Sequence, residues 1–102
     1  MQSISVHELH QQFDHYLLID VRESWEWEIA NINGAMHIPL RDLSTNISQL
    51  DCDRSIAVLC HHGFRSAKAS ELLLQHGLAA VYNVTGGIDA WSKEIDPSVP
   101  LY

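Results

Sequence analysis

One cysteine of the chain has the surroundings that make a thiol reactive. Cys60 follows an apolar run at residues 55–59 and opens a short loop at 61–65, behind which a helix is expected. A short loop crowds its backbone N–H groups around the sulfur, and the positive end of the helix dipole points the same way. Both effects favour the thiolate, which is the nucleophilic form. Cys60 is therefore the candidate catalytic residue.

The residues after Cys60 argue against a cysteine that only fills the core. Gly63 permits a backbone in which successive N–H groups converge into an anion-binding nest. Arg65 adds a permanent positive charge, and Ser66 is expected to cap the following helix. A core cysteine needs none of these features. We take the loop as the candidate substrate-binding segment: His61, His62, Gly63, Phe64 and Arg65.

The loop side chains leave alternatives open. Arg65 either orients an anionic substrate or forms an ion pair that holds the loop. His61 and His62 either contact the substrate or offer only their backbone N–H groups. Phe64 is expected to pack on the sheet rather than to wall the pocket.

The chain offers no recognisable metal or cofactor motif. Cys52 lies between Asp51 and Asp53 in a polar turn, which makes it the less reactive thiol. The two cysteines form no Cys-x-x-Cys pair, which weakens the case for a zinc ribbon or a thioredoxin-type site. The seven histidines lack a ligand set at recognisable spacing, so we expect no metal and no cofactor.

Length and charge narrow the function classes. A chain of 102 residues suits one domain, 1–102. With a net charge of −7 and six scattered Lys and Arg residues, it lacks the basic face that nucleic-acid binding needs. No apolar run approaches the ~20 residues of a membrane span, and no signal peptide is recognisable. We expect a cytoplasmic protein without a membrane partner.

The hydrophobic pattern predicts strands that alternate with helices. Continuous apolar runs at 16–21 and 55–59 are typical of strands buried on both faces. Shorter strands are expected at 36–38 and 80–84, and helices at 5–13, 24–29, 66–76 and 88–94, with helical turns in 40–50. This order predicts an α/β fold with a parallel central sheet of about five strands flanked by helices on both faces. Active sites of such sheets lie beyond the carboxyl ends of the strands, where Cys60 falls.

Four motifs in one order resemble the rhodanese domain, a sulfurtransferase fold, over nearly the whole chain. The matches are Asp20-Val21-Arg22, the stretch 26–39, the loop from Cys60 to Arg65, and Gly86-Gly87 with Trp91. Within the second motif, Ala30, Asn31 and Asn33 replace the commoner Gly, His and Pro.

The resemblance implies a sulfurtransferase. The Cys60 thiolate would take the outer sulfur of a donor such as thiosulfate, hold it as a persulfide stabilised by the loop N–H groups, and pass it to a thiol or protein acceptor. Asp20 and Arg22 are expected to form a supporting buried pair, and Ser66 to support the loop. The tail 96–102 is similar to that of rhodanese domains fused to adenylating enzymes, which pass sulfur to small carrier proteins.

Two other functions are weighed against this one. Tyrosine-type phosphatases use Cys-x5-Arg, whereas Cys60 and Arg65 form the shorter Cys-x4-Arg, which opposes a phosphatase or an arsenate reductase. The main alternative is a non-catalytic rhodanese-fold binding or sulfur-carrier module. The presence of Cys60 distinguishes the enzyme from the non-catalytic module, because silent members of the family usually lack this cysteine.

Overall fold

Five parallel strands form one sheet in the order β1-β5-β4-β2-β3. The computed structural model describes residues 1–102. The strands are β1 (Gln2–Ile4), β2 (Tyr16–Asp20), β3 (Met36–His37), β4 (Ser55–Leu59) and β5 (Val81–Val84). The prediction of a parallel sheet of about five strands is confirmed.

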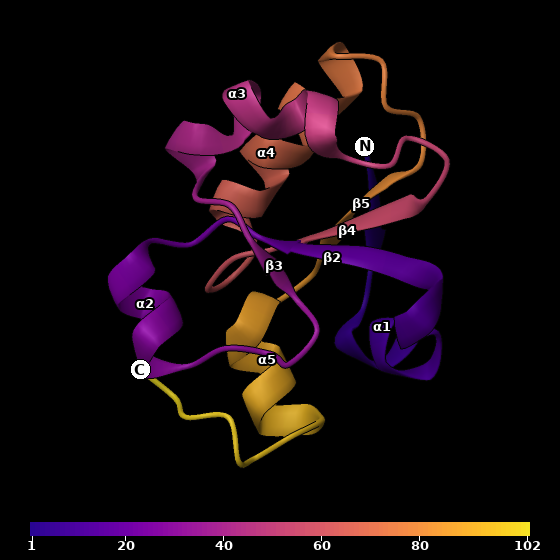
Figure 1. The fold of residues 1–102 in the computed structure, drawn as a ribbon. Coiled ribbons are helices and arrows are strands. Elements are labelled where there is room, and N and C mark those ends of the chain that lie inside the picture. Colours follow the sequence, from indigo (N-terminus) through magenta and orange to yellow (C-terminus); the bar gives the residue numbers. More distant parts are fainter.

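Helices cover both faces of the sheet, as the sequence predicts (Figure 1). They are α1 (Val6–Gln11), α2 (Ser24–Ile29), α3 (Leu43–Asn46), α4 (Phe64–Gln75) and α5 (Gly87–Glu94). Three short 3₁₀ turns complete the chain: Phe13–His15, Leu40–Asp42 and Ile47–Gln49. No helix has the length and apolar character that crossing a membrane requires.

Alternation along β4 divides the core into two halves. Ile56 and Val58 pack with Leu73 of α4 and Leu43 of α3. Their neighbours Ala57 and Leu59 point to the opposite face, toward α1 and α5. Because successive side chains of a strand point to opposite faces, one apolar strand serves both halves of the core.

The first strand is absent from the sequence prediction. In β1 only Ile4 is buried, while Gln2 and Ser3 are exposed at the edge of the sheet. A three-residue strand with one buried side chain leaves no apolar alternation to detect. The strand exists because its backbone pairs with β5.

The helix starts differ in detail from the prediction. Ser5 caps α1 through a capping box with Glu8, as its position in the sequence predicts. The expected caps Ser24 and Ser66 instead lie inside their helices, because Glu23 and Gly63 occupy the N-cap positions of α2 and α4. The shift places Ser66 in the first turn of α4, fully buried.

The sheet register brings the motif residues to one edge. Asp20 at the end of β2 lies opposite Leu59 at the end of β4, and β4 in turn pairs with β5. The residues that follow these strands, Arg22, Cys60 and Gly86, therefore emerge at the same carboxyl edge. This is the edge at which open parallel sheets place their ligands.

Candidate active site

Cys60 is the first residue after β4, and its sulfur lies beneath the loop. The residue is 1% exposed, and Sγ accepts a hydrogen bond from the N–H of Gly63 at 3.0 Å. Ser66 Oγ lies 3.3 Å from Sγ. The sequence analysis expected several N–H groups of the loop around the sulfur, but only the Gly63 N–H forms a hydrogen bond to it.

Gly63 makes this hydrogen bond possible through its backbone conformation. Its φ of +115° lies in the left-handed region, which other residues rarely adopt, and it turns the N–H back toward the sulfur before α4 begins. The positive φ is consistent with the glycine that the sequence analysis singled out at this position.

The start of α5 clamps the other end of the loop. The N–H groups of Ile88 and Asp89 donate to the carbonyl oxygens of Cys60 (2.9 Å) and His61 (3.1 Å). A Cβ at Gly87 would fall well inside van der Waals contact with both oxygens. Gly87 therefore allows the close backbone approach between α5 and the loop.

Asn83, which the sequence reasoning missed, orients Ser66. The Ser66 hydroxyl donates to Asn83 Oδ1, and Asn83 Nδ2 donates to the Gly63 carbonyl at 3.2 Å. A hydroxyl has one proton, so Ser66 Oγ faces the sulfur as an acceptor. A thiol S–H at Cys60 fits this arrangement, whereas donation to a thiolate requires the Ser66 hydroxyl to rotate.

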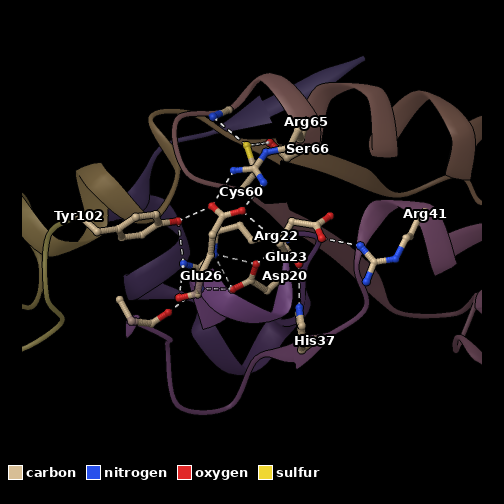
Figure 2. A network of polar contacts seen from close by, with 12 residues as sticks. Asp20, Arg22, Glu23, Glu26, His37, Arg41, Cys60, Arg65, Ser66 and Tyr102 are labelled. Carbon is tan, nitrogen blue, oxygen red and sulfur yellow. Dashed lines mark hydrogen bonds and ion pairs between the residues drawn. The ribbon is translucent and has the colours of Figure 1, made fainter. Parts of the chain in front are cut away.

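Arg65 forms an ion pair with Glu26 of α2, the loop-holding alternative of the two that the sequence left open (Figure 2). Arg65 Nη1 donates to Glu26 Oε1, and Nη2 donates to Oε2 at 2.8 Å. Burial alone would raise the pKa of the Glu26 carboxyl, but hydrogen bonds from Arg65, Tyr102 and the Glu23 N–H lower it to about 2. The same pair raises the pKa of Arg65.

Asp20 and Arg22 form the predicted buried pair. Both side chains are fully buried, and Arg22 Nη2 donates to Asp20 Oδ2 at 2.7 Å. The guanidinium also donates to the carbonyl oxygens of Glu26 and Ala30, which fixes the carboxyl end of α2. The pair thus joins the end of β2 to α2.

Tyr102 brings the tail onto the loop, and the sequence reasoning gave it no role. Its hydroxyl donates to Glu26 Oε2 at 2.6 Å and accepts from Arg22 Nη1 at 2.9 Å. Its ring stacks on His61, with centroids 4.0 Å apart and planes inclined by 7°. Burial, together with the negative Glu26, raises the pKa of Tyr102 to about 12, so the phenol stays protonated. Figure 2 shows the phenol, Glu26 and Arg65 in one line of polar contacts.

The remaining loop side chains point in different directions. His61 is half-buried. The pKa of its imidazole is lowered, mainly by burial and also by the nearby His62. His62 is exposed, and its ring is tilted by 31° against that of His61, with centroids 4.0 Å apart. Phe64 is 83% exposed, so the expectation that it packs on the sheet is wrong. As the first residue of α4, it lies on the helix face away from buried Ser66 and Ala69.

Comparison with known proteins is consistent with this site and fold. The rhodanese-like domain family matches residues 5–94. An Arabidopsis thaliana protein named rhodanese-like/PpiC domain-containing protein 12, chloroplastic, is 40% identical over 112 residues, covering 100% of this chain and 38% of that protein. The chain thus spans 38% of the length of that relative.

Solved structures agree along the whole chain. A rhodanese-related protein from Thermoplasma volcanium superposes with a TM-score of 0.88 and 37% identity, over 93% of this chain and 94% of that one. A rhodanese-like domain protein from Staphylococcus aureus gives a TM-score of 0.86 and 28% identity, over 100% and 99% of the two chains. With its sheet, its clamped cysteine loop and these matches, the chain belongs to the rhodanese-like domain family.

Proposed function

We propose that the protein is a sulfurtransferase that carries a sulfane sulfur as a persulfide on Cys60. The observation that supports this most is the hydrogen bond from the Gly63 N–H to Cys60 Sγ, in a loop that α5 clamps from the other side. A fixed N–H donor at an anionic sulfur is worth far more inside a protein than in water. Membership of the rhodanese-like family supports sulfur transfer in general, and thiosulfate is our proposal for the donor.

The proposed reaction has two halves. The Cys60 thiolate attacks the outer sulfur of thiosulfate, the S–S bond of the donor breaks, and sulfite leaves with the bonding pair. An acceptor nucleophile, a thiol of a small molecule or of a protein, then attacks the terminal sulfur of the persulfide and restores the Cys60 thiolate. Two separate half-reactions predict ping-pong kinetics. The Gly63 N–H stabilises the anionic sulfur in both.

The residues around Cys60 have distinct roles in this proposal. Arg65 holds the loop through Glu26, and its side chain, 36% exposed, also adds positive potential for an anionic donor. His62 in the loop and Phe64 at the start of α4 are exposed, and we propose that they contact the donor or the acceptor. Ser66 accepts from the thiol and rotates to donate when the sulfur ionises.

Mass spectrometry of the intact protein tests the proposal. Reduced protein incubated with thiosulfate is expected to gain one sulfur, which cyanide then removes as thiocyanate. Cys60→Ser should lose the gain, while Cys52→Ser should keep it, because Cys52 is exposed and precedes β4, whereas Cys60 follows it. A gain that persists in Cys60→Ser, or depends on Cys52, contradicts the assignment.

A non-catalytic binding or carrier module is the second candidate. It is favoured by the burial of Cys60, which is 1% exposed. If folded, reduced protein gains no sulfur from thiosulfate or from a polysulfide, this second function is the correct one.

The compartment and the partners are also proposals. We propose a cytoplasmic protein with a small sulfur donor and a thiol or protein acceptor, without nucleic acid or membrane. The name of the Arabidopsis relative places that protein in the chloroplast. Fractionation of the source cells, followed by detection of the chain, tests the compartment.

A further inference from the structure

We propose that His61, His62 and Asp89 form a binding site for a divalent transition-metal ion such as Zn²⁺ at the rim of the Cys60 loop. One ligand atom from each residue, two ring nitrogens and a carboxylate oxygen, lies within 4.8 Å of the others. No other three metal-ligating side chains of the chain come together in this way. Binding of the ion does not depend on sulfur transfer.

The chemistry of the three donors selects the ion. Imidazole nitrogens suit Zn²⁺, Cu²⁺ and Ni²⁺, and two His with one carboxylate leave open positions for water or a further ligand. In a tetrahedral site, bonds of about 2.0–2.2 Å place neighbouring ligand atoms roughly 3.4 Å apart, so ligand atoms within 4.8 Å of one another need only a small approach to close around the ion. A site of this kind is expected to be moderate in affinity and exchangeable.

The backbone and the neighbouring rings already hold the donors in place. The Asp89 N–H donates to the His61 carbonyl at 3.1 Å, so the two segments that supply the ligands are tied together. His61 lies between two rings, Tyr102 and His62, each with its centroid 4.0 Å away. A site whose ligands are held by such secondary contacts loses less entropy when the ion binds.

Lys93 competes with the metal ion for the Asp89 carboxylate. Its ammonium lies 3.0 Å from Asp89 Oδ2, one turn along α5. The hydrogen bond from Lys93 is the main cause that lowers the pKa of Asp89. A metal ion at Asp89 must share the carboxylate with this charge or displace it, so removal of Lys93 should strengthen binding rather than weaken it.

The spacing in the sequence explains why the site was not predicted. His61 and His62 are adjacent in the loop after β4, but Asp89 follows 27 residues after His62, in helix α5. Only the clamp between the loop and α5 brings the carboxylate to the histidines. The sequence analysis expected no metal, on the basis of local spacing alone.

Calorimetric titration of tag-free, reduced protein with Zn²⁺ and with Ni²⁺ tests the site. We expect one ion per chain, and an affinity at least about tenfold lower in His62→Ala and in Asp89→Asn, both substitutions at positions with access to solvent. In Lys93→Ala the affinity should rise about twofold or more. Circular dichroism verifies the fold of each variant.

Two sets of control variants separate this site from others. His7 and Glu94 form an exposed pair at 2.9 Å that also involves α5, so Glu94→Gln should leave binding unchanged. Cys60→Ser and Cys52→Ser should also bind normally. Unchanged affinity in Asp89→Asn, or loss of binding in either cysteine variant, overturns the proposal, the latter because it indicates a thiolate site.

A bound ion has one consequence that rests on the proposed function. Since residues 61 and 62 belong to the loop that must admit the sulfur donor, Zn²⁺ is expected to slow persulfide formation in the native chain but not in Asp89→Asn. Failure of sulfur loading with intact Zn²⁺ binding would contradict the proposed function and leave the metal site standing. Intact loading with no Zn²⁺ binding would do the reverse.

Discussion

At the scale of single residues, Glu26 connects α2 to both the loop and the tail. Its carboxylate accepts from Arg65 of the loop, from Tyr102 of the tail and from the N–H of Glu23 at the start of α2. The side chain is 3% exposed, so these bonds lie in a medium of low polarity where they are strong. One charged group thus fixes three segments that are distant in the sequence.

Glu26→Gln is predicted to destabilise the fold. The amide keeps the shape of the side chain but leaves the Arg65 guanidinium without a counter-charge, and breaking a largely buried pair from one side costs about 2 kcal/mol after allowance for the part of Arg65 that reaches solvent. Urea unfolding at pH 7 measures the free energy. Arg41→Gln, which removes the exposed pair with Glu23, is the control and should have no measurable effect. Equal stabilities of the two variants would contradict the role given to Glu26.

At the scale of elements, the sequence predicts the strands and helices that depend on local residue patterns. The sequence predicts β2, β4 and the capping box of α1 because the residues that determine them are close together in the chain. Glu26, Asn83 and Tyr102 were missed as site residues because each acts through a partner 17 to 76 positions away. The start of α4 was placed two residues late, because Gly63 rather than a serine ends the loop.

The clamp between the loop and α5 predicts a large effect for Gly87→Ala. The new methyl group would collide with the Cys60 and His61 carbonyl oxygens, and the residue would also have to adopt a φ of +61°. We expect a loss of roughly 3 kcal/mol or displacement of the loop, with loss of the proposed persulfide formation in either case. Gly77→Ala is the matched control, because Gly77 has a φ of +92° and nothing within 4 Å of its added Cβ. It should lose only about 1 kcal/mol, the cost of the backbone conformation.

Both glycine variants are measured by urea unfolding and by the mass gained from thiosulfate. If Gly87→Ala behaves like Gly77→Ala in both measurements, the contact between the start of α5 and the loop does not hold the site together.

At the scale of the whole molecule, the parallel sheet gathers the site from four separate segments. Strands β2, β4 and β5 end at one edge, and the tail returns beside α2 to the same edge (Figure 1). The molecule has a net charge of −7, so the cations Arg22 and Arg65 at this edge are exceptions in an acidic chain. They are held there by Asp20 and Glu26, which ties the integrity of the site to the ionisation of carboxylates.

The dependence of the site on ionised carboxylates predicts how the free energy of unfolding varies with pH. The pKa of Glu26 is about 2 in the fold against an ordinary value of 4.5, so folding is favoured by its ionised form. Its contribution, on the order of 3 kcal/mol, is complete above pH 4.5 and is lost as the pH falls toward 2. The chain has thirteen Asp and Glu residues, so the pH dependence of its total stability does not isolate Glu26. The difference in the free energy of unfolding between the native chain and Glu26→Gln isolates the single carboxyl from this background.

That difference, measured by urea unfolding at pH 6 and at successive lower pH values, should be constant above pH 4.5 and shrink steadily below it. A difference that stays constant down to pH 2.5 would mean that the Glu26 carboxylate gains nothing from Arg65 and Tyr102.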